Sequence, residues 1–280
     1  MHPRAISIYH SPDADDAFMF FAIAEGHVKD VRYKISLHTS DVESLNNRAR
    51  NEQLDVTAIS AHAIAYLDDR YCVLDAGSSF AGSDYGPVLA ASRPIIWSKT
   101  PRIAVPGALT TAALALQIFL HDIGAESELV PVNFDDVQKF ILEGKVDGGI
   151  LIHEGQLTHK EHGMICEVNL GEWWFKQYGR LLPLGLNAAS LALGSETLGG
   201  VKELVARSIQ YGLEHRPEAL RFASEFRRGL SAEHLDRFVS WYVNDRSVSL
   251  GEDGREAIRF LLERGFECGA ISRPVNPTFI

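Results

Sequence analysis

The sequence is poor in cysteine, and its three cysteines lie far apart. Cys72, Cys166 and Cys268 form no CxxC pair, so the sequence indicates neither a disulfide framework nor a zinc-binding motif. This cysteine usage is typical of a reducing compartment, and we expect a cytoplasmic protein. The first residues show no apolar region followed by a small-residue cleavage site, so we also expect no secretory signal.

Clusters of basic residues and long apolar runs are missing as well. The formal net charge is -10, and no patch of Lys or Arg stands out along the chain. This balance argues against nucleic acid and anionic membrane surfaces as partners. The apolar stretch from Leu109 to Leu120 is interrupted by threonine and glutamine, and no window of about 18 apolar residues occurs, so we expect no membrane insertion.

Several sequence motifs for cofactors and catalysis are absent. The glycines form neither G-x-G-x-x-G nor a P-loop, which argues against dinucleotides and nucleoside triphosphates, and no G-x-S-x-G elbow of a serine hydrolase is present. His153, His159 and His162 have a spacing that does not match the helical H-E-x-x-H zinc motif. We therefore expect no metal, no dinucleotide and no nucleoside triphosphate.

Strand and helix patterns alternate in two runs, one from Ala5 to Leu67 and one from Arg102 to Leu151, before a helical C-terminal part. Such alternation predicts an α/β protein with parallel strands and crossover helices. Extended segments at Val88–Ser92 and Leu182–Ser190 predict a double crossing between two lobes. We assign 1–93 plus 188–280 to a larger lobe and 94–187 to a smaller one, with a ligand cleft between them, as in type II periplasmic-binding-type proteins.

The most informative segment runs from Asp147 to Glu154. Its apolar part predicts a buried strand that ends on His153. Open α/β sheets bind ligands at the carboxyl ends of their strands, which is where His153 would lie. Histidine titrates near neutral pH and is suited to general base catalysis. Glu154, the next residue, would face the opposite way if the strand continued, so we do not expect it to share the proton of His153.

An acidic loop follows the first expected strand and precedes a helix expected over Ala17–Glu25. It contains Ser11, Asp13, Asp15 and Asp16. These carboxylates could complement the helix dipole, bind a metal, or accept hydrogen bonds from ligand hydroxyl groups. No second oxygen-rich cluster supports the metal.

Two further polar junctions precede expected helices. The segment Ala58, Ile59 and Ser60 ends a strand, and Ser60 could cap the helix that follows it or face a ligand. The next helix is expected to begin at Thr110 and Thr111, shortly after Gly107. Free backbone amides and hydroxyl groups at such a helix start can bind a carboxylate. The alternative is that one threonine is an ordinary N-cap. Upstream, Ser40 and Glu43 have the spacing of a capping box.

These segments together resemble one family, the 1,4-dihydroxy-6-naphthoate synthases of the futalosine route to menaquinone. The similarity covers nearly the whole chain in order; its main segments are Ser11–Phe20, Asp41–Asn46, Val56–Ser60, Tyr85–Pro87, Val105–Gly107 with Thr110 and Thr111, Ile152–Glu154, Leu182–Gly185 and Tyr242–Asn244. Individually the motifs are weak, whereas their ordered set is specific.

The resemblance implies a two-lobed fold without a cofactor and a lyase that converts cyclic dehypoxanthinylfutalosine, a small-molecule carboxylate, to 1,4-dihydroxy-6-naphthoate. His153 matches the family's proton acceptor, and the segments with Ala58, Ile59 and Ser60 and with Thr110 and Thr111 match segments that contact substrate. Ser11, Asp15 and Asp16 would orient hydroxyl groups or a ketone. We expect a monomer or a homodimer.

The chain departs from the family pattern in its acidic loop. The family loop often reads S-P-C-P-N-D-T-F, so Asp15 replaces a neutral amide and Ala17 replaces a threonine, and some members carry a lysine where this chain has Ala58. The loop resembles that of a subgroup within the family. Two alternative functions stay open. One is chorismate dehydratase, an enzyme of the same superfamily with a similar fold, and the other is a solute-binding protein that carries a ligand without converting it.

Overall fold

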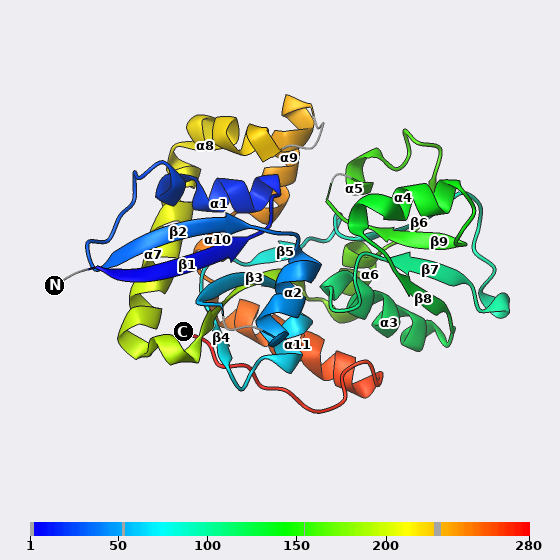
Figure 1. Ribbon diagram of the computed structural model, residues 1–280. Coiled ribbons are helices and arrows are strands. Elements are labelled where there is room, and N and C mark those ends of the chain that lie inside the picture. Colours follow the sequence, from blue (N-terminus) through cyan, green and yellow to red (C-terminus); the bar gives the residue numbers. More distant parts are fainter. Residues whose placement is uncertain (1–2, 52–53, 154, 227–230) are drawn as a thin grey trace.

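The computed structural model describes residues 3–51, 54–153, 155–226 and 231–280 of the chain. Within these residues the strands form two sheets, one in each of two lobes (Figure 1). The two-lobed α/β architecture predicted from the sequence is confirmed. Glu154 lies outside the described residues.

The six-stranded sheet of the larger lobe has the order β2-β1-β3-β11-β4, and β5 pairs with β11. Its strands are β1 (Arg4–His10), β2 (Tyr33–Thr39), β3 (Val56–Ser60), β4 (Tyr71–Val73), β5 (Ser79–Ala81) and β11 (Leu182–Ser190). The strands β1, β2 and β3 are parallel, as the alternation predicts. The returning strand β11 runs antiparallel to β3 because it enters from the other lobe.

The five-stranded sheet of the smaller lobe has the order β10-β6-β9-β7-β8. Its strands are β6 (Val88–Ala91), β7 (Arg102–Val105), β8 (Glu128–Pro131), β9 (Gly148–Leu151) and β10 (Ile165–Asn169). The strands β7, β8 and β9 are parallel, whereas β6 is antiparallel to both β9 and β10.

The sheets divide the chain at slightly different places from our boundaries. The strand β6, which we assigned to the larger lobe, pairs within the smaller one, and all of β11 from Leu182 pairs within the larger one. The chain therefore crosses between lobes just before Val88 and just before Leu182. Because each crossing lies directly before an apolar strand, the apolar pattern does not show to which sheet that strand belongs.

Helices cover both faces of each sheet. They are α1 (Ala14–Ala24), α2 (Val42–Asn51), α3 (Thr111–Ile123), α4 (Phe134–Leu142), α5 (Gly155–Thr158), α6 (Leu170–Tyr178), α7 (Ser195–Glu214), α8 (Arg216–Ala223), α9 (Ala232–Tyr242), α10 (Asp245–Val248) and α11 (Gly251–Glu267), with 3₁₀ turns at Ala63–Tyr66, Trp97–Lys99, Leu191–Leu193 and Ser224–Phe226. None of the helices in the described ranges has the length and apolar character needed to cross a bilayer.

Two helix starts differ from the expected ones. The helix α1 begins at Ala14, so Asp15 and Asp16 lie in its first turn and the preceding loop is shorter than we expected. The expected capping box of Ser40 and Glu43 is wrong: α2 begins at Val42, and the Asp41 carboxylate accepts the Ser44 N–H at 2.9 Å. Asp41 is therefore the cap, because it stands one position nearer the helix and satisfies the Ser44 N–H, one of the orphan amides of the first turn.

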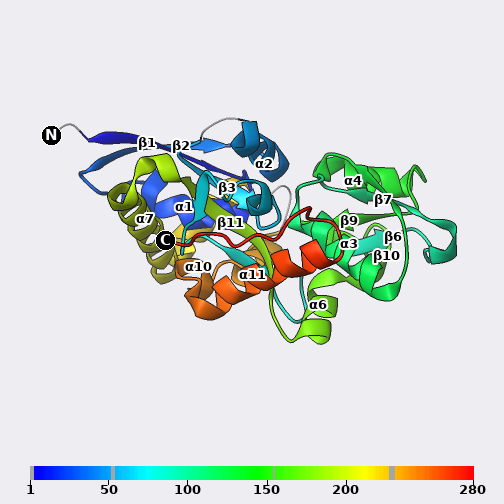
Figure 2. The ribbon, with the colours of Figure 1, turned by 90° about the horizontal axis from the view of Figure 1, so that it is seen from below.

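One apolar core continues from the larger lobe into the smaller one. The helix α11 contributes Leu261 and Leu262, and α3 contributes Leu114 and Leu116, to the same buried cluster. In Figure 2 these two helices lie side by side at the junction of the lobes. A separate core lies between the other face of the larger sheet and α1, α7, α8 and α9. The continuous core sets how closely the lobes approach.

We predict that Gly171→Ala destabilises the protein. A Cβ at Gly171 would lie 2.2 Å from the Tyr85 carbonyl oxygen, where the first crossing segment packs on α6. Overpacking of this kind costs about 1–3 kcal/mol in the free energy of unfolding. Gly199→Ala is the matched control, because its Cβ meets nothing within 4 Å inside α7 and alanine should stabilise the helix by about 0.5–1 kcal/mol. Urea unfolding of both variants measures the two effects, and equal midpoints would contradict the prediction.

Candidate active site

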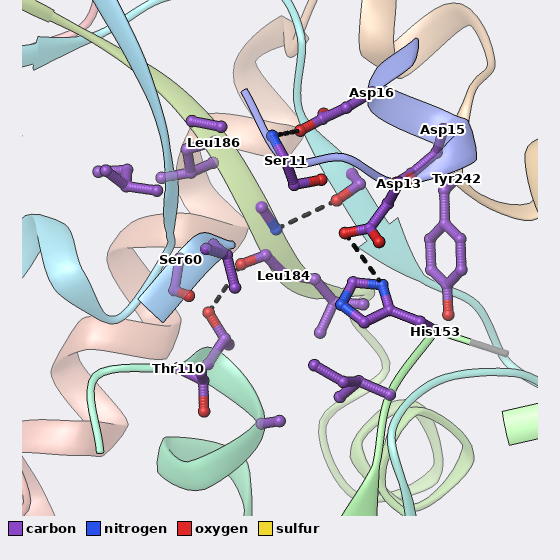
Figure 3. A pocket seen from close by; sticks show the side chains of 18 of the residues that line it. Ser11, Asp13, Asp15, Asp16, Ser60, Thr110, His153, Leu184, Leu186 and Tyr242 are labelled. Atoms are coloured by element: carbon purple, nitrogen blue, oxygen red, sulfur yellow. Dashed lines mark hydrogen bonds and ion pairs between the residues drawn. The ribbon is translucent and has the colours of Figure 1, made fainter. Parts of the chain in front are cut away.

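A cleft lies between the two lobes and encloses about 780 Å³, counting the part open to solvent. Pockets of roughly 300–1,000 Å³ are typical of small-molecule sites. The cleft brings together every site residue expected from the sequence: Ser11, Asp15, Asp16, Ala58, Ile59, Ser60, Thr110, Thr111 and His153. Figure 3 shows most of their side chains facing one another from several elements. Their proximity is a result of the fold, whereas their roles remain predictions.

His153 follows the last residue of β9 by two positions and stands at the mouth of the cleft. Its backbone is in the left-handed region, with φ 51°, which is uncommon for a residue other than glycine. The side chain is 17% exposed, and its Nδ1 atom lies 3.5 Å from Oδ2 of Asp13. The ring also meets Phe134 edge-on at 5.1 Å. The second ring nitrogen points toward the side of the cleft that holds Ser60 and Thr110 (Figure 3).

The backbone of His153 is held by Gln156. In the amide orientation that gives every polar atom a partner, the Gln156 oxygen accepts the His153 N–H at 3.1 Å and its nitrogen donates to the Gly86 carbonyl at 2.7 Å. The same amide lies 2.6 Å from the hydroxyl group of Tyr242, which comes from α9 of the larger lobe. Burial raises the pKa of Tyr242, so its hydroxyl group stays protonated near neutral pH.

The acidic loop places three carboxyl groups along one wall of the cleft. Asp16 is buried and accepts the Ser11 N–H at 2.7 Å, and burial raises its pKa even though His10 and Ser11 act in the opposite direction. Burial also raises the pKa of Asp15 well above the ordinary value, and the charges of Asp16 and Asp13 raise it further. The Oδ1 atom of Asp15 is buried without a hydrogen bond in the structure. A protonated Asp15 can donate a hydrogen bond into the cleft.

At the start of α3 the two threonine hydroxyl groups are both used by the protein. Thr110 is the N-cap, as one alternative held, and its hydroxyl group accepts the Ala113 N–H at 3.2 Å. The Thr111 hydroxyl group donates to the Leu184 carbonyl at 2.7 Å and accepts the His62 N–H at 3.2 Å. What this helix start offers a ligand is therefore its first backbone amides, those of Thr111 and Ala112, both of which line the cleft.

Ser60 does not cap the turn that follows it. Its hydroxyl group accepts a hydrogen bond from Asn46 Nδ2 at 3.1 Å, and its N–H donates to Asn46 Oδ1 at 2.9 Å. Asn46 in turn donates to Glu43, whose carboxylate also accepts the Leu109 N–H of the smaller lobe at 3.3 Å. Burial raises the pKa of Glu43. Glu43 lies so close to Gly107, which has φ 124°, that a Cβ there would be 2.5 Å from the Glu43 carboxyl carbon.

The lining of the cleft contains no Lys or Arg among the described residues. The nearby His62 is buried, and burial lowers its pKa to about 4, so it is neutral near pH 7. Within residues 3–51, 54–153, 155–226 and 231–280, no group of three His, Cys, Asp or Glu side chains could hold a metal ion. The described lining thus offers an anionic ligand group no side-chain ammonium or guanidinium group, so its candidate partners are neutral donors, among them the backbone amides at the start of α3.

Asp13, Gln156 and Tyr242 were missing from the site expected from the sequence. Asp13 belongs to the acidic loop, but only the fold shows that it faces His153. Gln156 follows the strand mouth by a few residues, and Tyr242 ends a helix far along the chain, where aromatic residues normally pack in the core. The similarity segment Tyr242–Asn244 was the one signal that could have included Tyr242.

A family model described as menaquinone biosynthesis matches residues 6–267 of this chain. The chain belongs to this family. A curated relative from Thermus thermophilus, "1,4-dihydroxy-6-naphtoate synthase", is 32% identical over 99% of this chain and 100% of its own length. A relative of the same name from Streptomyces coelicolor is 29% identical over 97% of this chain and 96% of its own length. The chain is thus placed among the enzymes of menaquinone biosynthesis.

Solved structures share the fold of this chain. A crystal structure of a protein from Archaeoglobus fulgidus has a TM-score of 0.89 and 39% identity, and covers 97% of this chain and 100% of that one. An alkanesulfonate-binding protein from Xanthomonas axonopodis pv. citri has a TM-score of 0.72 at 10% identity, covering 99% of this chain and 97% of that one. The second similarity shows the shared fold alone. These similarities confirm the type II periplasmic-binding-protein-like fold predicted from the sequence.

We predict that Asp15→Asn stabilises the protein at neutral pH. The folded state raises the pKa of Asp15, so folding favours the protonated form, and stability is lost as pH rises from the unfolded-state pKa near 4 toward the higher folded value. Asparagine removes this loss, and the melting temperature should rise by about 2–4 °C for each kcal/mol gained.

The gain from Asp15→Asn should be present at pH 7 and shrink as pH falls toward 4. Calorimetry of both proteins across this range measures it. Asp253→Asn is the control, because an exposed carboxyl group whose partner Arg246 lowers its pKa should give the opposite sign. A pH-independent difference between wild type and Asp15→Asn would contradict the prediction.

Proposed function

We propose that this chain is a 1,4-dihydroxy-6-naphthoate synthase, a lyase that converts cyclic dehypoxanthinylfutalosine without a cofactor. The observation that carries the proposal is His153 at the mouth of an interlobe cleft, in a chain that belongs to the menaquinone-biosynthesis family. The curated relatives bear the name of this activity and match the chain over nearly their full length. We also propose that the reaction takes place in the cytoplasm, consistent with the cysteine usage.

In this proposal His153 acts as the general base. Its Nε2 atom removes a proton from the bound spiro compound, and elimination with ring opening follows. Aromatisation of the product to the naphthoate provides the driving force. The partly buried position of the ring supports this role, because water is largely excluded around the proton transfer when the lobes are together.

The substrate's carboxylate would be held at the N-terminus of α3. The backbone amides of Thr111 and Ala112 and the positive end of the helix dipole would attract it, since the described lining of the cleft contains no Lys or Arg. The hydroxyl groups and ketone of the sugar remnant would face Ser11, Asp15, Asp16 and Ser60, which offer oxygens and, at Asp15, a proton. The carboxylate and the sugar remnant would then lie at different ends of the cleft.

The proposal predicts that His153→Ala loses turnover by at least about 10²-fold while product still binds, since general base catalysis contributes about 10²–10⁴. Purified protein is incubated with cyclic dehypoxanthinylfutalosine, and the naphthoate is followed by its absorbance and mass. His162→Ala is a matched control, because that histidine does not line the cleft. Full turnover in His153→Ala would remove the general base from the proposal.

The same assay separates the alternative functions. Formation of an enolpyruvyl product from chorismate, with no naphthoate from the futalosine derivative, would identify a chorismate dehydratase. Tight binding of a solute with no conversion of either compound would indicate a binding protein. Either result would overturn the proposed activity.

A further inference from the structure

We propose that Asp13 positions His153 as a general base and that closure of the two lobes assembles this pair. The inference rests on the proposed function of His153 and adds a residue and a conformational step to it. It starts from the location of the two side chains, which come from different lobes and meet across the cleft at 3.5 Å (Figure 3).

The carboxylate and the imidazole are held by separate elements. Asp13 precedes α1 in the larger lobe and is 3% exposed, so it is fixed by its surroundings. His153 follows β9 in the smaller lobe. Within its own lobe the ring packs against Phe134, which cannot accept a proton. Any rotation that opens the lobes must therefore move the imidazole away from the carboxylate.

A second contact across the cleft supports the backbone of His153. The Tyr242 hydroxyl group of the larger lobe meets the Gln156 amide at 2.6 Å, and that amide accepts the His153 N–H. The turn at His153 has a left-handed backbone, which needs surrounding structure to hold it. The larger lobe therefore fixes both the backbone and the ring of His153, and it does so only when the lobes are closed.

The pairing has a direct chemical consequence. A carboxylate that accepts the Nδ1–H proton fixes the tautomer in which Nε2 is free to receive a proton, and it stabilises the imidazolium that forms. The other ionisable groups facing this part of the cleft are Asp15, Asp16 and Tyr242. Asp13 is the member of this set at ion-pair distance from the ring. A base oriented by closure would act on enclosed substrate and be less effective in the open cleft.

The test compares wild type with Asp13→Asn, which keeps the size of the side chain and removes its charge. We expect kcat to fall by about 10²-fold, within the range of general base effects. The acid limb of the kcat/KM profile should move to lower pH, because the protonated ring loses its stabilising charge. A structural role alone would lower activity without moving this limb. Tyr242→Phe is the companion variant, because it weakens the support that Gln156 gives to the His153 backbone. It should reduce kcat and leave the acid limb of the kcat/KM profile where it is in wild type.

A second measurement does not depend on turnover. The His153 ring is titrated by NMR in wild type and in Asp13→Asn, each with and without 1,4-dihydroxy-6-naphthoate. We expect the product to shift the wild-type titration to higher pH by closing the lobes, and to shift the variant much less. Equal titrations in all four samples would overturn the pairing even if the protein makes the naphthoate. If wild type makes none, the proposed function fails, while the comparison of wild type with Asp13→Asn in the absence of product still decides whether Asp13 and His153 pair.

Discussion

The continuous apolar core between α11 and α3 is the constraint on which the site depends. Leu114 of α3 lies in the same cluster as Leu261 and Leu262 of α11, so the start of α3 is fixed relative to the larger lobe. The Thr111 hydroxyl group then reaches the Leu184 carbonyl of β11 at 2.7 Å. Because this side of the junction is packed, opening and closing would take place chiefly at the opposite side, where Asp13 faces His153.

Charge in the cleft follows from this arrangement. Asp13 and Asp16 are buried beside Asp15, and burial raises the pKa values of Asp15 and Asp16. Mutual repulsion favours protonation of the most buried groups, so the cleft contains both hydrogen-bond donors and acceptors built from carboxyl groups. An overall negative chain can still bind a carboxylate, since the amides at the α3 start present the opposite polarity at the far end of the cleft.

Much of this organisation could be predicted from the sequence. Period-two and short apolar runs located β1, β3, β7 and β9, and polar residues at or after the ends of these strands proved to lie in one cleft. What the sequence did not reveal depends on contacts between distant segments. Ser60 had a local interpretation as a cap, yet Asn46 occupies its hydroxyl group. Short strands such as β4 and β5 give too few residues for a pattern.

The backbone conformation of His153 could not be predicted from the residues around it. A β-strand extended to this residue would place its side chain by simple alternation, and the pairing with Asp13 could not be foreseen from that geometry. The observed left-handed φ of 51° turns the chain instead, and Gln156 satisfies the exposed N–H. Such a conformation costs on the order of 1–3 kcal/mol, which surrounding contacts must offset. Here the side-chain amide of Gln156 holds the turn through the His153 N–H. Tyr242 and Gly86, both outside the smaller sheet, contact that amide in turn. The strained turn is therefore stable to the extent that the lobes are closed, which links the geometry of the base to the state of the cleft.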